Sequence, residues 1–308
     1  MSEPGNSEGE FARPPTLHRV FLGRDDRLRP IFRALLFFTF ALALTVPLQL
    51  AVLKLGRGVP QGALLAALFA LLNPVWLLLS WFFLRVFDQR SFRTLGLWFY
   101  PGWGRQLAGG LGIGAGLMSV IVAGLVATRG VAYQSPGSAG TYVLLGILGN
   151  GSLMVLAAVF EEIAFHGYGF QRLVDAVGPL GAVAILSGLF GAAHLMNPSV
   201  TALSTANTAL AGVLLSVAYL KTRALWLPIG LHWAWNFTMG PIFSLPVSGL
   251  RFGPPLLRAK IIGPKWLTGG AYGPEGCVVL TMVCLGAILW LARTRRVSPS
   301  PAMEEVLK

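Results

Sequence analysis

The sequence has 308 residues, of which 55% are hydrophobic and only 12% are charged, and its mean hydropathy is +0.67. Soluble domains carry about 25% charged residues, so this composition excludes an ordinary soluble protein. The net charge of +12 does not indicate nucleic-acid binding, because the Lys and Arg residues punctuate apolar runs instead of gathering in one segment. Basic residues in such positions are determinants of membrane topology.

Long apolar runs follow a polar N-terminal stretch, residues 1–30, which we expect to be a flexible cytoplasmic tail. Several of these runs approach or exceed the roughly 18–20 residues that cross a bilayer as a helix. The sequence therefore predicts an all-α, polytopic membrane helix bundle of about eight transmembrane helices. We expect these helices near residues 31–53, 61–87, 107–127, 141–165, 179–197, 200–220, 224–245 and 276–293.

The remaining segments complete a domain at 31–293, whose motif-bearing core is 141–245, and a flexible C-terminal cytoplasmic tail at 294–308. The aromatic and basic segment 89–106 is typical of a membrane interface. We expect the fourth helix to continue past its apolar part toward Asp175, with Pro179 beginning the fifth. Glycines are frequent in the third and fifth predicted helices, and small residues allow transmembrane helices to pack closely.

An even number of spans places both termini on one side of the membrane. If that side is the cytoplasm, most of the 24 Lys and Arg residues lie inside, as the positive-inside rule requires. The basic residues that break this pattern gather mainly in the loop 246–275.

Two adjacent acids, Glu161 and Glu162, lie near the end of the fourth predicted helix, after an apolar run. An ionisable group within an apolar span costs roughly 2.5–3.5 kcal/mol on insertion scales, so it marks a functional site by default. The pair is therefore the first candidate for a site.

Three histidines lie in the same half of the chain as this acidic pair. His166 follows Glu162 by four residues, so the two share a helix face. His194 lies near the end of the fifth predicted helix, and His232 lies in the seventh, four residues before Asn236. Unpaired polar groups are costly in hydrocarbon, so we expect these side chains to converge around one cavity.

Convergence places a condition on the fifth helix. At 1.5 Å per residue, His194 lies farther from the cytoplasmic end of its helix than His232 does from the start of the seventh. The helices must therefore tilt, or the fifth must begin later than its apolar pattern indicates, or it must begin with a re-entrant segment.

Two mechanisms use such residues. A glutamate can act as general base on a water that histidines position, while other donors stabilise the oxyanion. Alternatively, Glu161, His194 and His232 hold a divalent metal, most plausibly zinc, whose bound water is the nucleophile. The His-Glu-x-x-His zinc signature is absent from the sequence. We therefore favour a mechanism that requires no cofactor and keep the metal as the alternative.

The order of these motifs resembles a known family. Glu161-Glu162-x-x-x-His166, Phe190-x-x-x-His194 and His232-x-x-x-Asn236 follow one another on successive predicted helices. They are similar to the motifs of the CPBP (Abi) intramembrane endopeptidases, which include CAAX prenyl proteases and bacteriocin-processing or immunity proteins. The similarity covers roughly residues 141–245.

The resemblance implies a hydrolase of the bacterial inner membrane that cleaves a membrane-anchored or lipidated peptide or protein. It implies that Glu161 activates water, that His194 shares this water, and that His232 and Asn236 form an oxyanion hole. Glu162 matches a second, supporting glutamate. His166 stands where the family has Arg; histidine can keep a hydrogen bond to Glu162, but it lacks the bidentate arginine fork.

The same residues also suit other functions. The glutamates also suit a proton relay in a proton-coupled secondary transporter, although no internal repeat is visible in the sequence. A non-catalytic, CPBP-like immunity or scaffold protein would retain the fold without cleavage. Glu162 and His166 can equally be a structural pair, and His194 an interfacial residue at a helix end. For Asn207, in the sixth predicted helix, we expect a hydrogen bond between helices.

Overall fold

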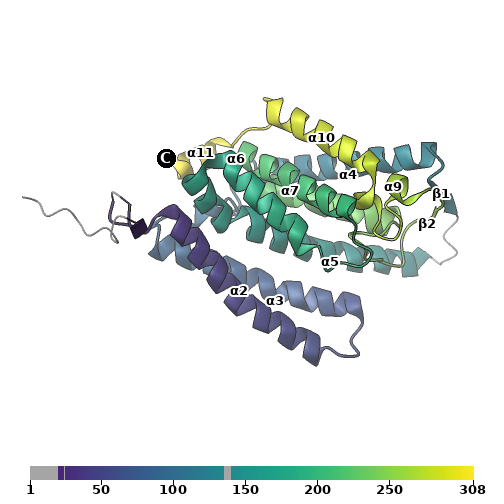
Figure 1. Ribbon diagram of the computed structural model, residues 1–308, viewed down its shortest axis with the longest axis horizontal. Coiled ribbons are helices and arrows are strands. Elements are labelled where there is room, and N and C mark those ends of the chain that lie inside the picture. Colours follow the sequence, from purple (N-terminus) through teal and green to yellow (C-terminus); the bar gives the residue numbers. More distant parts are fainter. Residues whose placement is uncertain (1–19, 24, 135–139) are drawn as a thin grey trace, which may run out of the picture.

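The computed structural model describes residues 20–23, 25–134 and 140–308. Its elements are α2 (Pro30–Leu55), α3 (Gln61–Val86), η1 (Phe92–Leu95), α4 (Trp103–Ala127), β1 (Val131–Gln134), α5 (Gly140–His166), α6 (Tyr168–Ala193), α7 (Ala202–Thr222), α8 (Trp226–Phe237), η2 (Thr238–Ile242), β2 (Arg258–Ile261), α9 (Lys265–Thr268), η3 (Pro274–Gly276), α10 (Val278–Arg293) and α11 (Pro301–Leu307). Figure 1 shows the long helices running along one common direction as a bundle.

The predicted membrane fold is confirmed. Within the described ranges, five helical stretches are long and apolar enough to cross a bilayer, and one of them, Gly140–Ala193, combines α5 and α6. Helices α8 and α10 occupy the other two predicted spans but are shorter. Large apolar side chains, among them Leu180 and Leu145, are exposed on the outside of the bundle, as lipid contact requires. The protein is therefore an integral membrane protein.

The fourth predicted helix does not continue toward Asp175. It ends at His166, because Gly167 has a non-helical ψ of −137°, and a new helix begins at Tyr168. Within α6 the backbone breaks again at Gly178, whose φ of 78° is left-handed, just before Pro179. Residues 168–177 thus form a short helical segment between the breaks at Gly167 and Gly178. The later part of α6 ends at Ala193, four residues before the predicted end, and leaves His194 as its cap.

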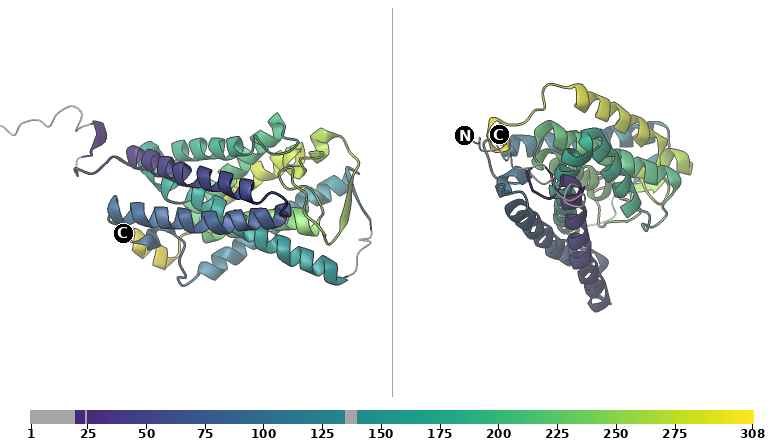
Figure 2. Two further views of the ribbon diagram at one scale, coloured as in Figure 1. Left: turned by 90° about the horizontal axis from the view of Figure 1, so that it is seen from below. Right: turned by 60° about the vertical axis from the view of Figure 1, so that its left-hand side comes forward.

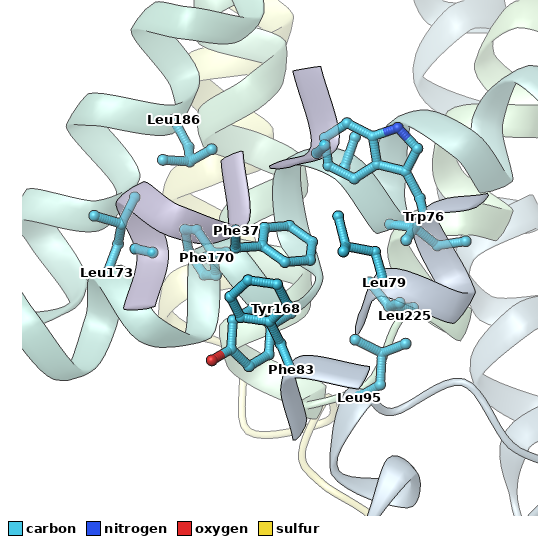
Figure 3. Close-up of a cluster of buried hydrophobic side chains, with 14 of the residues drawn as sticks. Phe37, Trp76, Leu79, Phe83, Leu95, Tyr168, Phe170, Leu173, Leu186 and Leu225 are labelled. Carbon is cyan, nitrogen blue, oxygen red and sulfur yellow. The ribbon is translucent and has the colours of Figure 1, made fainter. Parts of the chain in front are cut away.

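An aromatic cluster joins the first helices to the centre of the bundle. The ring of Phe37 in α2 packs against Trp76 and Phe83 of α3 and against Tyr168 of α6, with centroids 4.9–5.7 Å apart. Figure 3 shows these rings with Leu79 and Phe170 around them. This cluster holds one end of the α2–α3 hairpin, whereas its connecting turn stands away from the other helices (Figures 1 and 2).

Glycines allow α4 and α8 to lie in backbone contact. A β-carbon at Gly110 would lie 2.2 Å from the carbonyl oxygen of Leu227, and one at Gly114 would lie 2.2 Å from that of Leu231. Gly230 makes the reciprocal approach to the Leu107 carbonyl oxygen. The expected close packing of the glycine-rich third span is therefore present, and it sets the position of α8.

Loops and a small sheet cover the end of the bundle opposite α11 (Figure 1). Strand β1 pairs with β2 in an antiparallel sheet in which Val131 faces Ile261 and Gln134 faces Arg258. The sequence did not predict this sheet, because its strands are short and far apart in the chain. The loops between β2 and α10 complete this end.

The opposite end carries the charged contacts. The buried Asp88, just after α3, contacts Arg33 of α2 and Arg172 of α6. The predicted C-terminal tail is partly helical: Ser300 caps α11, and Met303 is buried in a cluster with Tyr100 and Ala224. The segment 294–308, predicted as a flexible tail, thus contains a helix that buries an apolar side chain. Most of the predicted N-terminal tail lies outside the described residues.

Candidate active site

The acidic pair lies in the last turns of α5, and its two members have different surroundings. The side chain of Glu162 has no solvent exposure, whereas that of Glu161 is 20% exposed and lines a cavity of about 880 Å³. Consecutive positions on an α-helix point about 100° apart. Glu162 consequently faces the neighbouring helices, and Glu161 faces the cavity.

Two histidines hold the buried carboxylate of Glu162. His166 Nδ1 lies 2.7 Å from Oε2, and His232 Nδ1 of α8 lies 2.7 Å from Oε1. An ionised carboxylate can only accept, so both histidines donate from Nδ1. The Nε2 atom of His166 lies 3.0 Å from the Ser216 hydroxyl of α7. The contact expected between Glu162 and His166 is present. Helices α5 and α8 meet at this carboxylate, and α7 is joined to it through His166.

His232 connects the two glutamates. Its Nδ1 donates to Glu162, and its Nε2 lies 3.7 Å from Oε2 of Glu161. Oε2 of Glu161 is buried and makes no hydrogen bond with any described residue. This oxygen is therefore available to a group that enters the cavity.

His194 and Asn236 line the same cavity. His194 caps α6, and its Nδ1–H donates to the carbonyl oxygen of Phe190 at 2.8 Å. The Phe190 ring lies between the two histidines, with its centroid 4.9 Å from that of His194 and 6.1 Å from that of His232. Asn236 follows one turn after His232 and is partly exposed. The structure thus brings all the predicted site residues together around Glu162 or along the cavity wall.

The breaks in α6 bear on how His194 reaches the same cavity as Glu161 and His232. Because the helix restarts at Pro179 after the Gly178 break, His194 is the cap of a segment shorter than the predicted fifth span. His194 therefore lies at a helix end, as the alternative interpretation of an interfacial residue predicted. It also lines the cavity together with Glu161. The helix restarts at Pro179, where its start was predicted, and it ends earlier than predicted, so the later start offered as one route to convergence is not what the structure shows.

The metal alternative concerns side chains that line the same cavity. Among the described residues, no three His, Cys, Asp or Glu side chains are grouped closely enough to hold a metal ion. The bond from His232 Nδ1 to Glu162 leaves Nε2 of His232 and Oε2 of Glu161 without a hydrogen bond among the described residues. The alternative metal set of Glu161, His194 and His232 therefore stays a prediction.

The sequence interpretation missed Glu275 and Ser248, which also line the cavity. Oε2 of Glu275 accepts hydrogen bonds from the amide nitrogen of Ser248 at 2.6 Å and from its hydroxyl at 2.7 Å. The available signal was a single acid within the glycine-rich stretch Gly269–Gly276, to which we assigned no role.

Comparison with known proteins gives one match. The family model described as type II CAAX prenyl endopeptidase Rce1-like matches residues 141–238. This range contains every residue of the three motifs from Glu161 to Asn236, and it leaves out Ser248 and Glu275. No curated protein and no solved structure matches the chain. The segment that carries the site is therefore similar to the Rce1-like type II CAAX prenyl endopeptidases, a family of proteases.

Proposed function

We propose that the protein is an intramembrane endopeptidase in which Glu161 activates water to hydrolyse a peptide bond near the end of a membrane-anchored or lipidated substrate. The observation that carries this proposal is the Oε2 atom of Glu161, which is buried beside the cavity without a hydrogen bond from the described protein. A carboxylate oxygen in this state is suited to accept a proton from a reacting water.

The reaction begins when Glu161 takes a proton from water as the water oxygen attacks the carbonyl carbon. His194, whose Nδ1 is bonded to Phe190, accepts a hydrogen bond from the same water at Nε2 in its neutral form. The carbon–nitrogen bond then breaks, and the proton held by Glu161 passes to the leaving amine. The second proton of the water stays on the new carboxyl group, so the products are a carboxylic acid and an amine, and atoms and charge balance.

His232 and Asn236 stabilise the negative oxygen of the tetrahedral intermediate. With both ring nitrogens protonated, His232 donates from Nδ1 to Glu162 and from Nε2 toward the oxyanion. The neighbouring carboxylates offset the charge of this form. Asn236, one turn further along α8, adds an amide donor. Preorganised donors of this kind supply about 2.7–4 kcal/mol each in known hydrolases.

Glu162 and His166 position these groups and do not react. Glu162 fixes the ring of His232 and is itself held by His166, which contacts Ser216. In this chain the pair of His166 and Ser216 takes the place that an arginine has in the family pattern.

The shape of the cavity supports a substrate with an apolar anchor. Its walls are contributed by α2 and α3 on one side and by α5 to α8 on the other. The α2 and α3 walls are largely apolar, for example at Phe38, Leu42 and Phe69. A lipid chain or an apolar peptide end can lie along them while the scissile bond reaches Glu161.

We also infer that both termini face the cytoplasm of a bacterial cell, with the protein in the inner membrane. The start of α2 and helix α11 lie at the same end of the bundle (Figure 1). That end carries Arg33, Arg172 and Arg293, and the positive-inside rule supports a cytoplasmic position for it.

The proposal is tested by comparing the C-termini of membrane proteins in cells that make the wild-type chain or the Glu161→Gln variant. We expect a set of shortened C-termini that requires the wild-type protein. The matched control is Glu305→Gln in the exposed part of α11, which should give the wild-type set. Identical termini with wild type and Glu161→Gln, at equal protein level, would contradict the proposal.

A further inference from the structure

Glu275 is an acid of the cavity that lies outside the matched family segment. It belongs to the turn η3 (Pro274–Gly276), directly before α10, and its side chain is partly exposed. It lines the same cavity as Glu161 and His194. The mechanism described above makes no use of it.

The backbone of Glu275 is held by Asn207, in the second turn of α7. The Asn207 side-chain amide donates to the carbonyl oxygens of Glu275 and Cys277, both at 2.9 Å. Its own oxygen accepts from the Thr281 hydroxyl of α10 at 2.7 Å. This is the interhelical hydrogen bond expected for Asn207, and it fixes where the Glu275 side chain begins.

The side chain is held at one oxygen only. Oε2 accepts both hydrogen bonds from Ser248, whereas Oε1 makes no hydrogen bond with any described residue. A carboxylate with a purely structural role would accept the same two hydrogen bonds from Ser248. The free oxygen in a cavity wall, however, is available to a ligand.

The turn after His194 contacts Ser248, the residue that donates to this carboxylate. The Asn197 side-chain amide donates to the carbonyl oxygen of Ser248 at 3.1 Å. Gly249, with a φ of 85°, lies so close to Pro198 that a β-carbon would be 2.1 Å from the Pro198 carbonyl oxygen. Glu275 thus lies at the His194 end of the cavity, near the groups proposed to act on the peptide bond.

The charge of the cavity wall points to the kind of group that Glu275 would take. Among the described residues that line the cavity, the ionisable side chains are those of Glu161, His194, His232 and Glu275, and none is Lys, Arg or Asp. The remaining lining is mostly apolar. A carboxylate in such surroundings interacts strongly with a charge on the ligand, because the local dielectric constant is low.

We propose that Glu275 determines specificity by binding a cationic side chain, lysine or arginine, of the substrate close to the scissile bond. By the same interaction it disfavours an acidic residue at that position. This inference rests on the proposed function, since it assigns a selecting residue to the same cavity.

The test uses synthetic peptides that carry a farnesylated cysteine followed by three residues, with Lys, Gln or Glu at each of the three positions in turn. Affinity is measured by fluorescence anisotropy on the Glu161→Gln variant in lipid nanodiscs, so that no cleavage occurs. At one position we expect the Lys peptide to bind about tenfold more tightly than the Glu peptide, as one charge contact allows. In Glu161→Gln/Glu275→Gln the difference should fall to about twofold or less.

Two variants separate selection from a structural role. Glutamine at 275 keeps an oxygen for Ser248 and removes only the charge. Ser248→Ala removes the hydroxyl donor and leaves the charge, so it should weaken binding of all peptides alike and retain the order Lys over Glu. Equal affinity for the Lys and Glu peptides at every position would overturn the inference, and so would a preference that survives Glu275→Gln.

Failure of the proposed function gives a different result. If the wild-type protein shows the charge preference in binding and yet cleaves no peptide, the inference stands and the protease proposal fails. If it cleaves Lys and Glu peptides with equal kcat/KM and binds them equally, the protease proposal stands and the role of Glu275 is wrong.

Discussion

Glu162 and His232 are joined by a hydrogen bond of 2.7 Å between α5 and α8, within a site where Glu162 is fully buried. This bond orients the imidazole so that its other nitrogen faces Glu161 at 3.7 Å. The two adjacent glutamates therefore have different roles: Glu162 supports the site from within the helix bundle, and Glu161 faces the cavity.

The contact between His166 and Glu162 gives the first prediction. His166→Ala removes one of the two donors to a fully buried carboxylate, so we expect the free energy of unfolding to fall by about 1–3 kcal/mol. Cleavage should fall as well, because Glu162, the partner of His232, is no longer held in place by His166. Thermal unfolding in detergent and a peptide-cleavage assay measure the two effects.

The matched control for this site is Ser216→Ala, which removes only the partner of His166 Nε2. It should cost about 0.5–1.5 kcal/mol. His166→Arg restores the residue of the family pattern and should retain more activity than His166→Ala. Unchanged stability and activity in His166→Ala would show that Glu162 does not depend on this histidine.

The glycine contact between α4 and α8 gives a prediction on stability. Gly114→Ala places a methyl group 2.2 Å from the Leu231 carbonyl oxygen, one residue before His232. We expect a loss of about 1–3 kcal/mol in the free energy of unfolding and reduced cleavage, because α8 must move. Gly116→Ala is the control, since a β-carbon there has no atom within 4 Å. Equal melting temperatures for the two variants would contradict the close packing.

Sequence patterns predicted the helical bundle and the convergence of Glu161, His194 and His232, because each polar group stood alone within an apolar span. They could not predict the breaks at Gly167 and Gly178, since glycine tolerates helical and non-helical backbone alike. They also could not predict Glu275. An acid in a loop costs no free energy of membrane insertion, so nothing in the sequence marks it as functional. The position of the Glu275 side chain depends on contacts with Ser248 and Asn207, which are remote in the chain.

Removal of metal ions tests how the water is activated. We propose that Glu161 acts as the base without a metal, so extensive treatment with EDTA should leave the rate of cleavage within about twofold of the untreated rate. Metal analysis of the purified protein accompanies this assay. If EDTA abolishes cleavage and added zinc restores it, the nucleophile is a metal-bound water and the proposed mechanism is wrong.

The acid at the His194 end gives a prediction on pH. Burial raises the pKa of the Glu275 carboxyl above its ordinary value of 4.5, although the hydrogen bonds from Ser248 and the neighbouring His194 and His232 oppose this. A raised pKa means that the charged form is present above that pKa and is lost as the pH falls through it. The preference for Lys peptides should therefore decline at a pH higher than 4.5.

This titration is measured as binding to Glu161→Gln, which removes one of the ionisable groups around the cavity. His194, His232 and Tyr272 remain near Glu275, and the Glu161→Gln/Glu275→Gln variant retains all three. For this double variant, the ratio of the dissociation constants of the Glu and Lys peptides should stay constant over the same pH range. A ratio that changes equally in both variants would assign the effect to the histidines.

The most direct test of the account is single-turnover cleavage of a farnesylated peptide by the purified protein in lipid nanodiscs, with binding measured on the same samples. Glu161→Gln should bind the peptide and cleave it about 10²–10⁴-fold more slowly, the range expected for the loss of a general base. Glu305→Gln, in the exposed C-terminal helix, should match the wild type in both. Cleavage by folded Glu161→Gln at the wild-type rate would show that Glu161 does not activate the water.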